Sequence, residues 1–217
     1  MIAVQPSPRW ERTTLTAALI LVWALVVVTP LSLMMLSHMV PLRAPAPPKS
    51  TAEFQSATLA ALASSRTNRQ PGNGWKMVHV LVSGCPCSSF TAQSLAARKP
   101  STECQEIVLI LGFVPDWESA LVQSGFEVQH KDGEQLARET GIEGGPWLLL
   151  ISPEGKIAYS GGYAAQRPRP GIILEDLNLM HAAVSGAIPT IYPAYGCAST
   201  PLLQGRLDPL GVCQSVK

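Results

Sequence analysis

The chain has 217 residues and a formal net charge of +1, so its charge gives no reason to expect a nucleic-acid partner. Hydrophobic residues make up 47% of the chain and charged residues only 14%, and much of this imbalance comes from one segment near the N-terminus. A membrane anchor followed by one soluble domain of ordinary size accounts for both figures.

Residues 13–40 contain no Lys, Arg, Asp or Glu, and the apolar core at residues 15–36 is long enough to cross a lipid bilayer, for which about 20 residues suffice. A secretory signal peptide has an apolar core of roughly 7–15 residues, which favours an uncleaved anchor. The basic residues on the two sides of the span are nearly equal in number, so charge alone does not orient it. The short N-terminal tail and the cysteines favour a domain outside the cytoplasm. Residues 1–40 are therefore predicted to be a tail and a single transmembrane helix.

Residues 41–74 link this anchor to the domain. The proline-rich stretch at 41–48 predicts a semi-rigid, extended spacer, and the alanine-rich stretch at 51–64 predicts a short helix. Residues 66–74 form a turn-rich entry loop, so the domain is expected to begin at Trp75.

The motif Cys85-Pro86-Cys87 follows an apolar run at residues 77–82 that has the character of a buried strand. Ser83 and Gly84 mark the end of this strand, and the next residues predict a helix to about residue 97. Thiols at the start of a helix feel the unpaired backbone N–H groups and the helix dipole, which favour the thiolate. The pair therefore indicates redox or metal chemistry, with Cys85 expected to be the more exposed thiol.

Strands and helices alternate over the rest of the domain, and a β-hairpin and a helix close it. This pattern predicts an α/β fold of three layers with a mixed central sheet, spanning residues 75–186. The predicted elements are a strand at 107–111, a helix at 116–124, a strand at 126–128, a helical turn at 133–140, hairpin strands at 147–151 and 156–160, and a helix at 172–185.

Residues 187–217 form a proline-rich tail with little periodicity that carries Cys197 and Cys213. The tail can fold back so that Cys197 meets Cys85 or Cys87. Alternatively, Cys197 is an isolated thiol or pairs with Cys213. The chain has five cysteines, an odd number, so they cannot all pair with one another. The pairing of Cys104, Cys197 and Cys213 therefore stays open.

The domain resembles the thioredoxin-like superfamily, and in particular its membrane-anchored bacterial thiol–disulfide oxidoreductases. The resemblance depends on Gly84-Cys85-Pro86-Cys87 after a central strand, on Gly144-Gly145-Pro146 before another, and on the hairpin that follows. It implies a cis proline at Pro146 beside the active cysteines, where it helps bind substrate. The sequence departs from the usual motif because one residue, rather than two, separates the cysteines, so this is a Cys-Pro-Cys variant whose small disulfide ring would be strained.

The first functional hypothesis is an enzyme, a membrane-tethered thiol–disulfide oxidoreductase with Cys85 as the attacking nucleophile and Cys87 as the resolving thiol. It needs no bound cofactor. Its partners would be protein thiols or disulfides, a second redox protein and the lipid bilayer contacted by residues 15–36. It would lie in a bacterial inner membrane with its domain in the periplasm.

Two other classes of function stay open. A copper-binding or metal-delivery protein would hold a soft ion between Cys85, Cys87 and Cys197. A non-catalytic thioredoxin-like scaffold would bind partners without turnover.

His79 lies within an apolar strand and is expected to be buried and hydrogen-bonded. Glu106 and Asp116 are candidates for proton transfer to a cysteine, although acids at such positions commonly cap helices or face water.

Overall fold

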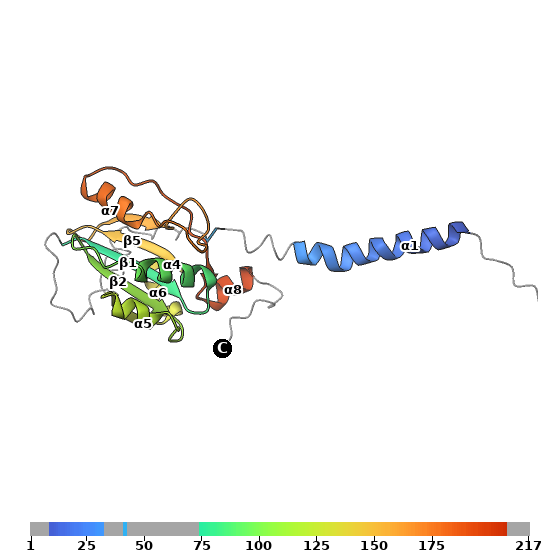
Figure 1. Cartoon of the computed structure of the whole chain (residues 1–217), viewed down its shortest axis with the longest axis horizontal. Helices are drawn as coiled ribbons and strands as arrows, with labels where there is room; N and C mark the ends of the chain where they lie inside the picture. The colour runs from blue at the N-terminus through green and yellow to red at the C-terminus, as the bar shows by residue number, and fades with distance from the viewer. Residues whose placement is uncertain (1–8, 33–40, 43–73, 208–217) are drawn as a thin grey trace, which may run out of the picture. The chain divides into compact units, whose positions relative to one another are not determined.

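A computed structural model describes residues 9–32, 41–42 and 74–207 of the chain (Figure 1). The chain divides into two units, Met1–Val40 and Pro41–Lys217. The helix predicted at residues 51–64, most of the spacer and Cys213 lie outside the described residues.

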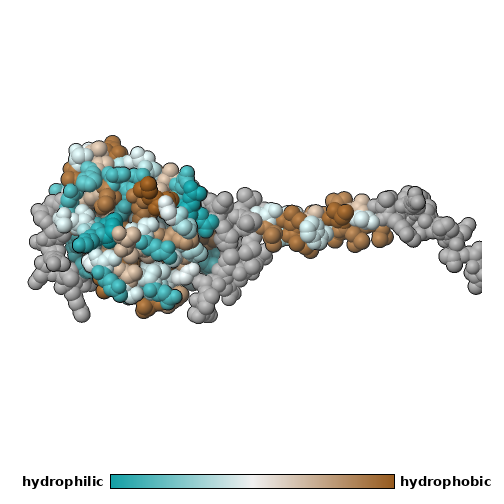
Figure 2. Space-filling view, viewed as in Figure 1, coloured by the Kyte–Doolittle hydropathy of each residue, from teal (hydrophilic) through white to brown (hydrophobic). Residues whose placement is uncertain are grey.

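The first unit contains a continuous apolar helix. Helix α1 spans Arg9–Trp23 and runs into a π-helical turn, η1, at Ala24–Val28. The segment Thr14–Ser32 has 19 residues, a mean hydropathy of 2.3 and none of its side chains buried within the structure. Figure 2 shows apolar surface along this helix. Its length and composition suit a membrane span.

A mixed sheet of five strands forms the centre of the second unit, in the order β3-β2-β1-β5-β6. β1, β2 and β3 are parallel, and β5 and β6 are antiparallel to their neighbours. The strands are β1 (Lys76–Val82), β2 (Gln105–Leu111), β3 (Glu127–Lys131), β5 (Trp147–Ile151) and β6 (Ile157–Gly161). The central strands β1, β2 and β5 are almost entirely buried, which explains their continuous apolar runs.

Helices cover both faces of the sheet (Figure 1). Apolar residues of α4, α5 and α7 pack with alternate residues of the strands on one face, whereas residues of α6 and α8 belong to the core on the other face. The helices are α4 (Pro86–Ala96), α5 (Glu118–Gln123), α6 (Gly133–Thr140), α7 (Asp176–Val184) and α8 (Pro201–Leu207). The predicted α/β fold with a mixed central sheet is confirmed, and its order of elements is thioredoxin-like.

The tail after α7 is part of this domain and contains regular structure that its lack of periodicity did not predict. A two-residue strand, β7 (Cys197–Ala198), pairs antiparallel with β4 (Gly144–Gly145). Leu203 of α8 is buried in the same core cluster as residues of β1 and β2. The tail has no repeating apolar pattern because it makes its contacts at single, widely spaced residues.

The start of the predicted spacer contacts the domain, which the sequence did not predict. The backbone N–H of Leu42 donates to the carbonyl of Ala194 at 2.6 Å, and both side chains are buried. Leu42 therefore packs against the returning tail, because its apolar side chain gains more from burial there than from exposure.

Candidate functional site

The two cysteines of the motif lie at the first turn of α4, as the sequence predicts. Cys85 has the extended backbone conformation of an N-cap residue, and Pro86 occupies the first helical turn, where a missing N–H costs no hydrogen bond. Ser88 contributes to the junction, because its hydroxyl accepts a hydrogen bond of 2.9 Å from the N–H of Val82. The strand, the break and the helix start thus hold Cys85 and Cys87 at the end of β1.

The returning tail brings a third thiol to this place. Cys197 lies opposite Gly145 in the pairing of β4 with β7. The thiol of Cys85 donates to the carbonyl of Gly145 at 3.7 Å and interacts with the thiols of both Cys87 and Cys197. The peptide bond between Gly145 and Pro146 is cis. The structure thus places Cys197 beside the motif, whereas Cys213 lies outside the described residues.

Glycines allow β7 and β4 to approach each other this closely. A Cβ at Gly196 would lie 1.8 Å from the carbonyl oxygen of Gly145 and 2.7 Å from the Cδ of Pro146. A Cβ at Gly145 would lie 2.7 Å from the carbonyl oxygen of Val80 in β1. Larger residues at these positions would force β7, β4 and β1 apart, so the backbone contact that places Cys197 depends on glycine.

Arg167 is a functional candidate that the sequence reasoning missed. Its Nε donates a hydrogen bond of 3.2 Å to the sulfur of Cys87, although the two residues are 80 positions apart. Arg167 belongs to the segment between β6 and α7, which has no helical or strand periodicity. A basic residue within a proline-rich connection is a weak pattern, so only the folded chain identifies it as a partner of the cysteine.

Each thiol of the motif is harder to ionise than a free cysteine. Its interaction with Cys197, together with burial, raises the pKa of Cys85 to about 11, although the contact with Cys87 opposes this. The adjacent Cys85 and burial raise the pKa of Cys87, while Arg167 lowers it. Neighbouring thiols cannot all carry a negative charge, and this outweighs the helix start that was expected to favour the thiolate.

Both thiols of the motif are buried to nearly the same degree, so exposure does not distinguish Cys85 from Cys87 as the sequence predicted. Cys85 is 2% exposed and Cys87 is 1% exposed, whereas Cys197 is only partly buried. The returning tail belongs to the same core cluster as the two motif cysteines, so it shields them from solvent.

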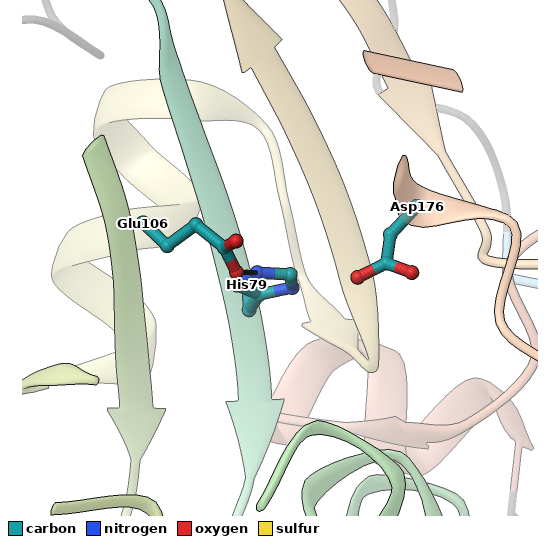
Figure 3. Close-up of side chains that lie close together, drawn as sticks. All are labelled: His79, Glu106 and Asp176. Atoms are coloured by element: carbon teal, nitrogen blue, oxygen red, sulfur yellow. Dashed lines mark hydrogen bonds and ion pairs between the residues drawn. The ribbon is translucent and has the colours of Figure 1, made fainter. Parts of the chain in front are cut away.

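A second group of ionisable side chains lies around the middle of β1, away from the cysteines that follow the strand (Figure 3). His79 on β1 contacts the carboxylate of Glu106 on β2 at 3.1 Å, and Asp176 enters from the start of α7. All three are buried, and His79 also contacts the hydroxyl of Tyr163 at 3.0 Å. The prediction that His79 is a buried, hydrogen-bonded residue is confirmed.

Arg98 neutralises the acids in this group. Its guanidinium donates to Glu106 at 2.8 Å and to Asp176 at 2.5 Å. Burial alone would raise the pKa of Glu106, but hydrogen bonds and charges from His79 and Arg98 outweigh it and lower the pKa to about 2. Ligand atoms of His79, Glu106 and Asp176 lie within 4.8 Å of one another, yet a metal ion would have to displace Arg98.

This position separates Glu106 from the two motif cysteines. In the register of the sheet Glu106 pairs with Met77, near the start of β1, whereas the cysteines follow its last residue. Asp116, the other acid considered for proton transfer, is exposed. The ion pairs of Arg98 with Glu106 and Asp176 therefore stabilise the packing of α7 on the sheet.

Cys104 belongs to a different part of the core from the three grouped thiols. It is buried with Met77, Leu148 and residues of α7. Burial, together with the charge of Glu106, raises the pKa of its thiol to about 12. Its surroundings are those of a structural cysteine.

Comparison with known proteins gives only distant structural likenesses. No protein-family model and no curated protein matches the sequence. An uncharacterized conserved protein from Geobacillus kaustophilus is 14% identical, with a TM-score of 0.48, and the match covers 60% of this chain and 80% of that one. A hypothetical protein from Sinorhizobium meliloti 1021 is 17% identical, with a TM-score of 0.46, over 68% and 81% of the two chains.

A third solved structure, a thioredoxin-like protein from Aeropyrum pernix, is 12% identical with a TM-score of 0.36, over 63% of this chain and 98% of that one. Because all three scores are below 0.5, we base the fold assignment on strand order and direction, and the site on its own geometry.

Proposed function

We propose that this protein is a membrane-tethered thiol–disulfide oxidoreductase that acts on protein thiols outside the cytoplasm. One observation carries the proposal: two thiols at the start of α4 meet a third thiol and an arginine, brought from two distant segments. Thiol–disulfide exchange needs an attacking sulfur, a second sulfur that resolves the mixed disulfide, and a group that favours the thiolate. Cys85, Cys87 and Arg167 supply these parts.

The two motif cysteines form the redox pair in this proposal. During reduction of a partner's disulfide, the Cys85–Cys87 bond forms while the partner's bond breaks, so two electrons and two protons pass to the partner. Arg167 favours the thiolate of Cys87, which is the form that attacks. A second dithiol protein then restores the reduced pair.

The apolar N-terminal helix supports the membrane part of the proposal. Residues Thr14–Ser32 would hold the domain at a bilayer, in a bacterial inner membrane with the cysteines on the periplasmic side, where disulfide chemistry is common. Labelling of Cys197 in intact spheroplasts by a membrane-impermeant maleimide tests this orientation. Labelling only after lysis would place the domain in the cytoplasm and contradict it.

A redox titration of the full chain in detergent micelles tests the proposed reaction. Glutathione buffers of graded potential are followed by alkylation and peptide mapping of each cysteine. A reversible two-electron transition shared by Cys85 and Cys87, absent from Cys85→Ser and from Cys87→Ser, supports the proposal. Thiols that stay reduced at every potential refute it.

A soft-metal site is the second candidate, and the convergence of three sulfurs favours it. Cys85, Cys87 and Cys197 together match the preference of Cu(I) for thiolate ligands. Arg167 argues against this function, because a guanidinium bonded to Cys87 opposes a second cation. Stoichiometric Cu(I) binding in competition with a chromogenic chelator, lost in Cys197→Ser, would favour metal delivery. A scaffold without turnover predicts neither a redox transition nor metal binding.

A further inference from the structure

The three grouped thiols differ in their access to a partner protein. Cys85 and Cys87 are 2% and 1% exposed, so a partner's sulfur cannot reach either of them while β7 stays paired with β4. Cys197 is only partly buried and lies on β7 itself. Cys197 is therefore the least buried of the three residues and the one that a partner can contact without displacing the tail.

We propose that Cys197 exchanges first with the partner protein and relays the disulfide to Cys85, which passes it to Cys87. This relay rests on the proposed oxidoreductase function and gives the tail a catalytic part in it. In this relay Cys197 on the tail reacts first with the partner, and the buried Cys85 and Cys87 thiols supply the two electrons.

The reaction can be written as three exchanges. The Cys197 thiolate attacks one sulfur of the partner's disulfide, the partner's S–S bond breaks, and the first partner thiolate leaves and takes up a proton. The Cys85 thiolate then attacks the sulfur of Cys197 and releases the second partner thiol. Finally the Cys87 thiolate attacks the sulfur of Cys85, forming the Cys85–Cys87 bond and releasing Cys197 as a thiol.

These exchanges balance. The partner disulfide gains two electrons and two protons, and the Cys85 and Cys87 thiols lose them. Cys197 is unchanged at the end, and a reduced dithiol protein restores the pair.

The contacts match the order of the relay. Cys197 lies opposite Gly145, whose carbonyl accepts the hydrogen bond from the thiol of Cys85, so the first and second sulfurs meet on one backbone pairing. The thiol of Cys85 interacts with both other thiols and is the middle member. Arg167 donates a hydrogen bond of 3.2 Å to the sulfur of Cys87, which places a cation at the last sulfur to attack.

A time course with oxidised glutathione tests the relay on the reduced full chain in detergent micelles. Samples are quenched with acid and mapped by mass spectrometry after tryptic digestion. Arg206 separates Cys197 from Cys213, and Arg98 separates the motif from Cys104. The relay predicts that glutathione appears first on Cys197, that it persists there in Cys85→Ser, and that in the natural chain it gives way to the Cys85–Cys87 disulfide.

The Cys197→Ser variant separates failure of the relay from failure of the proposed function. We expect it to form the Cys85–Cys87 disulfide at least tenfold more slowly, with the same equilibrium midpoint in glutathione buffers. An unchanged rate, or a first adduct on Cys85, would overturn the relay and leave the oxidoreductase proposal standing. Loss of the Cys85–Cys87 transition from the natural chain would overturn both.

Two further variants guard against effects on folding. Thermal unfolding of Cys197→Ala and Cys197→Ser, each compared with the natural chain, shows whether the domain tolerates loss of the thiol. Cys104→Ser removes a buried thiol outside the grouped three and should leave every rate within twofold of the natural chain. A similar slowing in Cys104→Ser would attribute the effect to packing and overturn the relay.

Discussion

Replacing Gly196 with alanine should separate the tail from the redox pair. A Cβ at this position would lie 1.8 Å from the carbonyl oxygen and 2.5 Å from the carbonyl carbon of Gly145. Non-bonded carbon and oxygen atoms approach no closer than about 3.3 Å, so β7 would have to move away from β4 by roughly 1.5 Å. Both obstructing atoms belong to the backbone and cannot rotate aside.

The size of the effect follows from the bonds that this shift breaks. The pairing of β4 with β7 involves only two residue pairs, and each backbone hydrogen bond contributes about 1 kcal/mol. Loss of one or two such bonds would raise the population of the open tail by roughly five- to thirty-fold. Cys85 is 2% exposed in the closed structure. The fraction of molecules in which it is accessible would rise by the same factor.

Alkylation by iodoacetamide, followed at Cys85 by mass spectrometry, measures this change. Gly205→Ala is the matched control, because a Cβ there meets nothing within 4 Å although the residue lies in the same tail. We expect Gly196→Ala to speed alkylation of Cys85 by five- to thirty-fold and Gly205→Ala to leave it unchanged. Equal rates in Gly196→Ala and the natural chain would refute the argument that glycine packing shields the site.

Three further predictions concern charge and ionisation. Replacing Arg167 with glutamine removes the hydrogen bond to Cys87 and should slow formation of the motif disulfide about tenfold at pH 7, by stopped-flow measurement. Because the folded pKa of Glu106 is about 2, below its ordinary value of 4.5, its contribution to stability is present above pH 4.5 and is lost toward pH 2. Between pH 6 and pH 3 the free energy of unfolding, measured in urea, should fall in both proteins. The fall should be about 2 kcal/mol smaller in Glu106→Gln than in the natural chain. Replacing Cys197 with alanine removes the main cause of the raised pKa of Cys85, so the thiolate absorbance at 240 nm should appear below pH 11.

Each of these predictions has its own control. Arg167→Lys keeps the charge and should recover part of the lost rate, whereas equal slowing by lysine and glutamine would mean that the charge is irrelevant. A pH dependence of unfolding that is the same with and without Glu106 would show that its ion pairs contribute nothing. For Cys85, an ionisation curve that does not move in Cys197→Ala would show that the two thiols are not coupled in solution.

Features with a local pattern in the chain could be predicted from the sequence. Continuous apolar runs identified the buried strands, and the break after Val82 placed Cys85 and Cys87 at the start of a helix. The turn residues between Ile151 and Ile157 identified the hairpin. Such features are set by neighbours a few residues apart, because periodicity and turn chemistry are short-range properties of the chain.

The completion of the site by distant segments could not be predicted from the sequence and is seen in the folded domain. Cys197 reaches Cys85 through a strand of two residues, and Arg167 reaches Cys87 from 80 positions away, in segments without periodicity. The same contacts buried the cysteines and raised their pKa, which reversed the expectations of an exposed, easily ionised Cys85. Contacts of this kind depend on the packing of the whole domain. The segments that make them are only a few residues long, which is too short to produce a recognisable pattern in the sequence.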